Sequence, residues 1–460
     1  MWSDEQGVRL DGGSLYIVEF DETSSDRIET TGKAALGGGF VALNPTNGST
    51  LGPREIREQL GRSFVILTAG GGIDGHFDER LLPQYAFIGA GLSYGRTEIT
   101  VDIARNGLSF ADAGRTKNQR AVGAAIEGLD EDDPVYKSLL ESVTLDVARA
   151  AETELAGEIH ADAVGQALSE GRRVQDTITD RLWRRSQTDA DRVWMKAMTG
   201  FGHSSGDGNA AEADRDVWGF VIGADRAVDN WVLGATAGFL QAATRTDRLG
   251  TVEQDSYHLG LYGQGQFGSI IIGFGGTYGF LDLSTRRAAF DDRLQADSDA
   301  RQAQVFGEVA YRLSWEEIAL EPFAGAGWTH VDFDGFRERG GDAALQGGAM
   351  SVDQAGSTLG VRVSTMLQAE DGSEMRPSLS IGWRHVFGDI VQDRDLHFAS
   401  APSGSRFDVS GVPDNRDSAV VSAGFDATLG GGLRFGFSYD GDLGDRTQDH
   451  AFTAKLNYSF

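Results

Sequence analysis

The chain has 460 residues, a formal net charge of -28 at pH 7, 63 glycines, 8 prolines and no cysteine. The length allows two or three domains, and the excess of glycine over proline favours a β-rich protein with many tight turns. The acidity argues against nucleic-acid binding, and the missing cysteine excludes disulfides, thiolate metal sites and cysteine nucleophiles.

Signals for targeting and for membrane helices are missing from the sequence. The start, MWSDEQGVRL, has no basic region followed by an apolar one, so an exported protein would have its signal, and anything else upstream, outside this sequence. The most apolar stretch, residues 270–281, is shorter than the roughly 18 to 20 residues of a membrane helix and contains glycines. Any membrane-spanning part must therefore be a barrel.

Residues 1 to about 110 carry brief apolar segments separated by glycines. The clearest are SLYIVEF (14–20), SFVILTA (63–69) and TEITVDIA (97–104), with glycine pairs or triplets at 12–13, 37–39 and 70–72. Short strands at irregular spacing fit either a β-sandwich or the last coils of a parallel β-solenoid. Both alternatives stay open because no repeat period separates them.

A helical run follows a polar boundary. The strand pattern is lost in residues 115–133, and the acidic cluster there ends at Pro134. From about Leu145 to Ser186 the composition favours helix, and ~40 residues at ~1.5 Å each would extend ~60 Å. Large apolar residues are few, and charged residues crowd the end: Arg172, Arg173, Asp176, Asp180, Arg181, Arg184 and Arg185. A helix this polar needs a surrounding that is filled with water or lined with charges.

The last part of the chain alternates strictly between apolar and polar residues. In AFTAKLNYSF (451–460), Phe452, Leu456 and Tyr458 share one face, and Thr453 and Lys455 the other. About twelve segments of ~9 to 12 residues repeat this split, which is the length of a tilted membrane strand. They span about 192–202, 215–225, 231–242, 254–265, 269–280, 302–313, 318–330, 355–368, 375–387, 417–429, 432–441 and 450–460. We predict an antiparallel outer-membrane barrel with its apolar face toward lipid.

The connections between these segments predict the orientation of the barrel. Those at 203–214, 243–253, 281–301, 331–354, 388–416 and 442–449 are longer than the alternate ones. Outer-membrane barrels have long extracellular loops and short periplasmic turns. The helix then enters from the periplasmic end, and residues before it emerge outside.

Charges shielded from water are normally paired, so we expect the helix arginines to contact carboxylates of the lumen. The candidates are Arg172, Arg173, Arg181, Arg184 and Arg185 on the helix and Glu308, Glu321 or Asp426 on the barrel. His160 has no second imidazole one turn away, and we interpret it as a lumen or interface contact.

The chain resembles the monomeric autotransporters of the type V secretion pathway over nearly its whole length. FVILTAGGGIDGHF and TKNQRAVGAAIEGL are similar to the family's pertactin-like passenger end, LAGEIHADAVGQAL with RRVQDTITDRL to its linker helix, and VWMKAMTGFG, RFDVSGVPDNRDSAVVSAGFDATL and NYSF to its barrel. No Asn-Asn pair occurs, so the self-cleavage of some relatives is not carried over.

The resemblance implies three parts. They are residues 1–128, a passenger stub forming the end of a right-handed parallel β-helix and resembling an autochaperone; residues 129–189, a linker with a pore-spanning helix; and residues 190–460, a twelve-stranded translocator barrel. It also implies a monomer in the outer membrane with the stub at the cell surface. The implied partners are lipid and lipopolysaccharide, periplasmic chaperones, the chain's own passenger, and the barrel-assembly machinery, which would recognise Tyr458 and Phe460.

Other motifs carry weaker signals. Residues 202–206 and 91–95 both fit G-x-S-x-G, but neither lies between a strand and a helix, so we expect no catalysis. Residues 263–268 fit G-x-G-x-x-G at a predicted strand-to-strand turn and are interpreted as a hairpin. Asp440, Asp442 and Asp445 offer oxygen ligands for calcium, yet a solvated acidic hairpin is favoured, and no metal or cofactor is expected. The alternative function is a porin or adhesin barrel with a periplasmic N-terminal domain.

Overall fold

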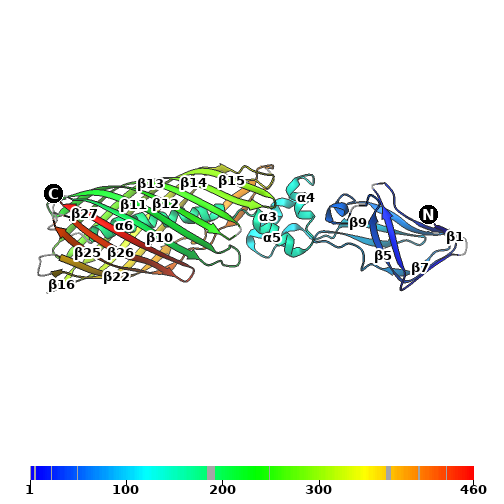
Figure 1. Cartoon of the computed structure of the whole chain (residues 1–460), viewed down its shortest axis with the longest axis horizontal. Coiled ribbons are helices and arrows are strands. Elements are labelled where there is room, and N and C mark those ends of the chain that lie inside the picture. Colours follow the sequence, from blue (N-terminus) through cyan, green and yellow to red (C-terminus); the bar gives the residue numbers. More distant parts are fainter. Residues whose placement is uncertain are drawn as a thin grey trace. The chain divides into compact units, whose positions relative to one another are not determined.

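A computed structural model of the chain describes residues 2–4, 7–21, 23–48, 50–183, 192–247, 249–368, 374–401, 405–430 and 433–459. They form two compact units: residues 1–115 with 122–152, and residues 116–121 with 153–460. Figure 1 labels many of their strands and helices. The predicted linker region therefore contributes to both units.

The strands of the first unit stack mainly in parallel. Strand β4 pairs in parallel with β1 and β6, and β5 pairs in parallel with β2, β3 and β7. An antiparallel pair, β8 and β9, follows. Parallel stacking of successive coils is solenoid geometry, so the β-sandwich alternative is wrong. The strands are β1 (Trp2–Asp4), β2 (Val8–Asp11), β3 (Leu15–Phe20), β4 (Ile28–Thr30), β5 (Ala34–Pro45), β6 (Ser63–Ala69), β7 (Ile73–Asp78), β8 (Ile88–Tyr94) and β9 (Glu98–Arg105).

Glycine is needed where neighbouring coils approach each other. Gly75 has φ +87°, and a Cβ there would lie 1.9 Å from the carbonyl oxygen of Leu36 on the adjacent coil. Only glycine satisfies both constraints. The interior beside this contact is apolar, with Val18, Val41 and Ile66 fully buried.

In the described part of the chain, five short helices precede the lumen helix in the sequence: one lies between β5 and β6, and the other four follow β9. They are α1 (Pro53–Arg57), α2 (Phe110–Ala113), α3 (Lys117–Glu127), α4 (Pro134–Leu140) and α5 (Leu145–Leu155). The Asp133 side chain accepts a hydrogen bond from Val135 N, and Pro134 occupies the first helical position of α4. Both features favour a helix start there.

The predicted single helix from Leu145 to Ser186 is wrong in one respect, because it is interrupted. Gly157 has φ +67° and separates α5 from α6 (Ile159–Trp183). With 25 residues, α6 is about 37 Å long instead of ~60 Å. None of the described helices combines the length and apolarity needed to cross a bilayer.

In the described ranges of the second unit, twelve antiparallel strands close into a barrel, as predicted. Each strand pairs with the next, and β27 pairs with β10 to close the ring. The strands are β10 (Arg192–Ser204), β11 (Ala213–Val228), β12 (Trp231–Thr246), β13 (Gly250–Phe267), β14 (Ile270–Ala289), β15 (Asp292–Tyr311), β17 (Ile318–Phe333), β20 (Met350–Thr365), β22 (Glu374–Phe387), β25 (Asp417–Gly430), β26 (Leu433–Gly444) and β27 (Thr447–Ser459). Two short extensions, β16 (Leu313–Trp315) and β21 (Leu367–Gln368), lengthen the ladder.

We call the barrel end at residues 205–212, between β10 and β11, the loop end, and the end at residues 229–230, between β11 and β12, the turn end. Several predicted long loops are strand instead. Strand β14 continues to Ala289 and β15 starts at Asp292, so most of the predicted loop 281–301 is a paired hairpin. Cross-strand charge pairs such as Arg286–Glu253 extend the ladder beyond the apolar band.

Two loop-end connections form a separate four-stranded sheet. Its strands are β18 (Phe336–Arg337), β19 (Leu345–Gly347), β23 (Asp393–Phe398) and β24 (Phe407–Ser410). The aromatic side chains Phe398 and Phe407 are buried in it.

The outward face of the barrel is apolar over most of its height. Leu261 on β13 is 71% exposed, and Leu259, Val305 and Ile381 are at least half exposed. Exposure of so many large apolar side chains is the pattern of a lipid-facing surface.

A charge placed on this face should cost more than a change of shape. We expect Leu261→Arg to destabilise the folded barrel by about 2–4 kcal/mol, because a cation near the bilayer midplane loses its hydration. Leu261→Phe is the control and should cost less than about 1.5 kcal/mol. Urea titrations of folding into lipid vesicles, followed by gel mobility, measure both; equal losses for the two variants would contradict a lipid-facing position.

Candidate functional site: a helix held in the barrel lumen

Helix α6 lies in the barrel lumen and packs against one part of its wall (Figure 1). Near the loop end, Val164 and Leu168 join a buried cluster with Leu281 and Val331 of the wall. Near the turn end, Val174, Ile178 and Leu182 pack with other inward-facing side chains: Trp194, Met198, Val217, Val221, Leu240, Ala242, Tyr262 and Phe306. The few apolar residues of α6 thus form one stripe, which faces mainly β12 to β15.

Small residues let the helix approach the wall. A Cβ at Gly171 would lie 2.5 Å from the Gln302 side chain and 2.7 Å from that of Gln304. Gln302 Nε2 donates to the carbonyl oxygen of Ala167 at 2.9 Å. Glycine and alanine therefore make room for polar wall side chains.

The opposite side of α6 carries charges, and the barrel supplies counter-charges. Arg172 pairs with Asp414 at 2.5 Å and donates to Gln354 at 2.7 Å. Arg173 lies 3.3 Å from Asp449 on β27. These two arginines are mostly buried, so unpaired charge there would be costly.

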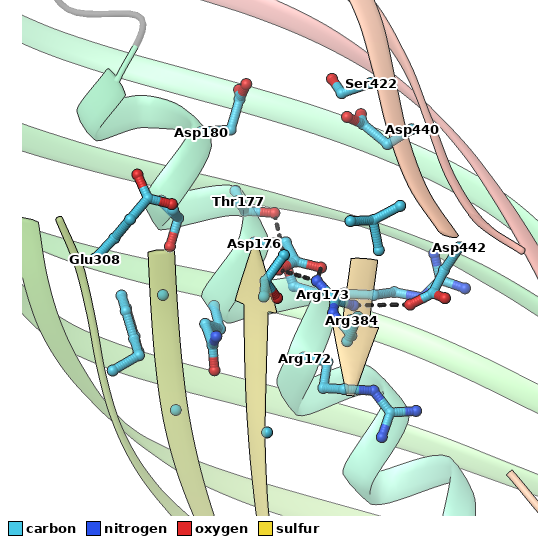
Figure 2. Close-up of a pocket in the computed structure, with 18 of the residues that line it drawn as sticks. Arg172, Arg173, Asp176, Thr177, Asp180, Glu308, Arg384, Ser422, Asp440 and Asp442 are labelled. Carbon is cyan, nitrogen blue, oxygen red and sulfur yellow. Dashed lines mark hydrogen bonds and ion pairs between the residues drawn. The ribbon is translucent and has the colours of Figure 1, made fainter. Parts of the chain in front are cut away.

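Further along the helix the signs reverse. Asp176 pairs with Arg384 of β22 at 2.8 Å, and Arg384 also pairs with Asp442 of β26 at 2.8 Å. Asp180 lies 2.6 Å from Lys196 and 3.0 Å from Lys455. Figure 2 shows the bridge from Asp176 through Arg384 to Asp442.

The turn end of the helix is held by a buried ion pair. Arg181 donates from two nitrogens to the Asp225 carboxylate, at 2.9 and 3.0 Å, and from Nη1 to Asn457 at 3.1 Å. Tyr262 donates its hydroxyl to Asp225 at 2.9 Å, and Trp194 Nε1 donates to the Tyr262 oxygen at 2.6 Å. This two-point guanidinium contact fixes both position and rotation of the helix.

The predicted partners of the helix arginines need correction. Glu308 and Glu321 face the lumen, but each is paired within the wall, with Arg362 and Arg312 respectively. Asp426 lines a small cavity beside Arg181. Tyr458 is 48% exposed on the outer face of β27. Arg184, Arg185 and Phe460 lie outside the described residues.

The sequence interpretation missed the actual partners. Asp225, Asp442 and Asp449 all lie on the inward parity of their strands. Asp225 ends the predicted segment 215–225, and extending two other segments by one residue would have included Asp442 and Asp449. Asp442 is consequently a lumen residue and not part of a solvated hairpin. Asp414 belongs to a long connection without any period, and the sequence has no signal for it.

A cavity of about 230 Å³ remains beside the charged side of α6. Asp176, Asp180, Glu308, Arg384 and Asp442 are among its lining residues (Figure 2). The helix is therefore off-centre: it packs mainly against β12 to β15, and on the cavity side it reaches β22 and β27 through charged side chains.

At the loop end, the buried carboxylate of Glu338 bonds residues of three elements. Glu338, between β18 and β19, accepts from Arg287 Nε at 2.7 Å and Nη2 at 2.8 Å, from His160 Nε2 at 2.7 Å and from Leu345 N at 2.7 Å. The Phe336 ring stacks on His160 with centroids 4.0 Å apart. Burial alone would raise the pKa of Glu338, but Arg287 and His160 outweigh it and the pKa falls to about 2.

More backbone and side-chain contacts surround the first turn of α6. Asp162 accepts from Val412 N at 2.9 Å and from Thr246 at 3.0 Å. Glu158 accepts from Ala211 N at 2.7 Å. We call the Glu338 cluster and these contacts the loop-end socket, and together they hold the first turn of α6.

The G-x-S-x-G motif at residues 202–206 does not assemble a nucleophile and base. His203 bonds Asp214 on the outer face, whereas Ser204 points inward and bonds Thr447 at 2.9 Å. Adjacent strand residues face opposite sides, so this pair cannot meet. In the motif at residues 91–95, the Ser93 hydroxyl bonds Asp102.

Removal of the Glu338 charge should destabilise the socket strongly. We expect Glu338→Gln to cost about 3–5 kcal/mol, because Arg287 would stay buried with its counter-charge gone. The control is Glu253→Gln, which removes an exposed pair and should cost about 0–1 kcal/mol. Thermal unfolding followed by gel mobility compares them.

The same carboxylate gives a pH dependence. Its pKa falls from 4.5 to about 2 on folding, so its contribution is present above about pH 4.5 and is lost as the pH falls toward 2. The difference between wild type and Glu338→Gln should shrink over this window. A constant difference would contradict the buried ion pair.

Comparisons with known proteins agree with this architecture. The family model described as autotransporter beta-domain matches residues 193–440. Two proteins named extracellular serine protease from Serratia marcescens are 30% and 31% identical over 98% of this chain, and the matches cover 48% of each relative. The chain thus spans about half the length of these curated relatives.

A solved structure shares the fold. The translocator domain of the autotransporter NalP from Neisseria meningitidis has a TM-score of 0.55 at 15% identity, covering 66% of this chain and 100% of that domain. The family match extends over more than half of the residues and falls on the closed barrel that surrounds α6. The chain therefore belongs to the autotransporter family, with residues 193–440 as its β-domain.

Proposed function

We propose that this outer-membrane barrel exports its own N-terminal passenger through the lumen and then anchors it at the cell surface through α6. The observation that carries the proposal is the set of charge pairs between α6 and the wall, because they give a segment threaded through the lumen a defined final position. The turn end would face the periplasm, and the loop end and residues 1–128 the outside.

Partners follow from this role. The chain acts as a monomer, with lipid and lipopolysaccharide around the barrel and periplasmic chaperones before insertion. Recognition of Tyr458 by the barrel-assembly machinery fits its place in the last strand, β27, and Phe460, the other residue of the proposed signal, lies outside the described residues. No cofactor or metal takes part.

The protease activity in the relatives' name is not carried over to this chain. The matches cover about half of each relative, and the two G-x-S-x-G motifs pair their serines with Thr447 and Asp102, not with a histidine. We propose a transport and anchoring role without catalysis by these residues.

Surface exposure of the stub can be tested on intact cells. An epitope in residues 23–48 should be removed by added protease, whereas a tag at residues 229–230, in the β11–β12 turn, should be spared until the outer membrane is permeabilised. The barrel itself should stay intact. Protection of the stub epitope, or cleavage at the turn on intact cells, would reverse the orientation.

Conductance separates this role from the porin alternative. Because α6 fills much of the lumen, the full chain in a planar bilayer should pass little current, and deletion of residues 159–183 should raise the conductance several-fold. A high, steady conductance of the full chain would favour a porin.

A further inference from the structure

The outer face of the barrel carries a repeated motif that export and anchoring do not use. On β10, β17 and β22, which all run toward the loop end, an outward aromatic residue is followed two positions later by an outward histidine. The three pairs are Phe201 with His203, Trp328 with His330, and Trp383 with His385.

Each histidine faces an aspartate on the next strand. The register places His203 opposite Asp214, His330 opposite Asp353 and His385 opposite Asp417. In all three cases Nδ1 bonds the carboxylate, at 2.8, 2.9 and 2.7 Å. We call these three sets, each an aromatic residue, a histidine and an aspartate, the outer triads.

The surroundings place the triads at the edge of the lipid-facing band. Their aromatic rings are 42–53% exposed and continue the apolar face below them. Beyond the rings toward the loop end, neighbouring strands carry charge pairs on the same face, such as Arg245–Asp216 and Arg286–Glu253. The opposite edge is apolar, with Val193, Leu233, Ile270 and Ile318 exposed. The two edges of the band therefore suit different headgroups.

The chemistry of the triads suits an external anion. With Nδ1 bonded to a carboxylate, Nε2 is the ring nitrogen that can meet an external group, and it donates when the ring carries both protons. Nε2 of His203 and of His385 has no hydrogen-bond partner within the described ranges. Charge-assisted bonds from imidazolium to phosphate oxygen are among the stronger hydrogen bonds, and aromatic rings sit well at a lipid interface.

We propose that the outer triads bind the phosphate groups of the phosphorylated glycolipid in the outer leaflet. His203 and His385 donate from Nε2 to a phosphate oxygen, each aspartate orients its ring, and the aromatic residues pack at the boundary between sugar and acyl chains. Nε2 of His330 already lies 3.2 Å from Asp332 Oδ1, so the third triad contributes its aromatic residue alone. Trp383 Nε1 also donates to Asp417 at 2.9 Å, which ties all three members of one triad together. This inference rests on the proposed orientation, with the loop end outside.

The test uses the full chain in vesicles of phosphatidylethanolamine that contain either bisphosphorylated lipid A or the same lipid with its phosphates removed. The midpoint of heat-induced loss of the compact gel form is measured. We expect the phosphorylated lipid to raise the wild-type midpoint by at least about 3 °C. The triple variant His203→Gln, His330→Gln, His385→Gln should lose most of that difference.

A matched control is His450→Gln. His450 is also on the outer face, but it bonds the Tyr439 hydroxyl at 2.8 Å instead of a carboxylate, so the lipid-dependent shift should persist. A wild type insensitive to the lipid phosphates, or a triple variant with the full shift, would overturn the proposal. An equal shift with phosphatidylglycerol vesicles, or with inorganic phosphate in detergent, would also overturn the assignment to the glycolipid.

The outcome is independent of export. The vesicle measurement needs only the folded barrel, and the protease test on intact cells reports orientation. Loss of the lipid effect with normal surface exposure of the stub would leave the proposed function standing. A preserved lipid effect with the stub protected would remove the orientation on which both rest.

Discussion

The pairing of charges between α6 and the lumen wall is the constraint on which the rest of this structure depends. A guanidinium removed from bulk water costs several kcal/mol unless a counter-charge and hydrogen bonds replace its hydration. Arg172, Arg173 and Arg181 each find a carboxylate that comes from outside the helix. Those carboxylates belong to different strands or connections, so the pairs exist only when the barrel is closed and the helix is in place.

The apolar contacts and the charged contacts of α6 have different effects on its position. The apolar stripe that faces β12 to β15 stabilises the seated helix through buried area, but it does not fix the helix orientation, because dispersion and burial tolerate small rotations. Two-point contacts such as Arg181 with Asp225 do not tolerate them. Burial thus favours a helix in the lumen, and charge pairing selects one register of that helix. The loop-end socket repeats the device around Glu338.

The barrel was predictable from sequence because each strand separates lipid from lumen. Apolar residues such as Leu261 and polar ones such as Lys196 alternate with a period of two, and no soluble core is needed to explain it. The same period would have placed Asp442 and Asp449 in the lumen. The predicted pairing of Glu308 with the helix was wrong because Arg362 of β20, two strands away across β17, already pairs with it, and contacts between strands are not readable from a single strand.

Other features have no such period. Asp414 and Glu338 lie in connections whose folding depends on tertiary contacts, and a helix-favouring composition conceals the break at Gly157. The loop at residues 281–301 was predicted too long because the alternation of apolar and polar residues marks only strands that face lipid. Outside the lipid, β14 and β15 continue as a paired hairpin that needs no apolar face. The register of α6 in the lumen depends on the helix surface and the wall surface together, so it cannot be inferred from the helix sequence alone.

The off-centre seat of α6 implies an uneven inner surface for the conduit while a chain is in transit. The wall that α6 covers is apolar, with Val221, Leu240, Leu281 and Val331 at most 1% exposed once the helix is seated. Before α6 occupies the lumen, this apolar strip and the charged wall opposite it, with Arg384 and Asp442, both face the polypeptide in transit. A lumen with one apolar side and one charged side makes weak contacts with both apolar and charged passenger segments, so neither kind of segment need be held up during passage.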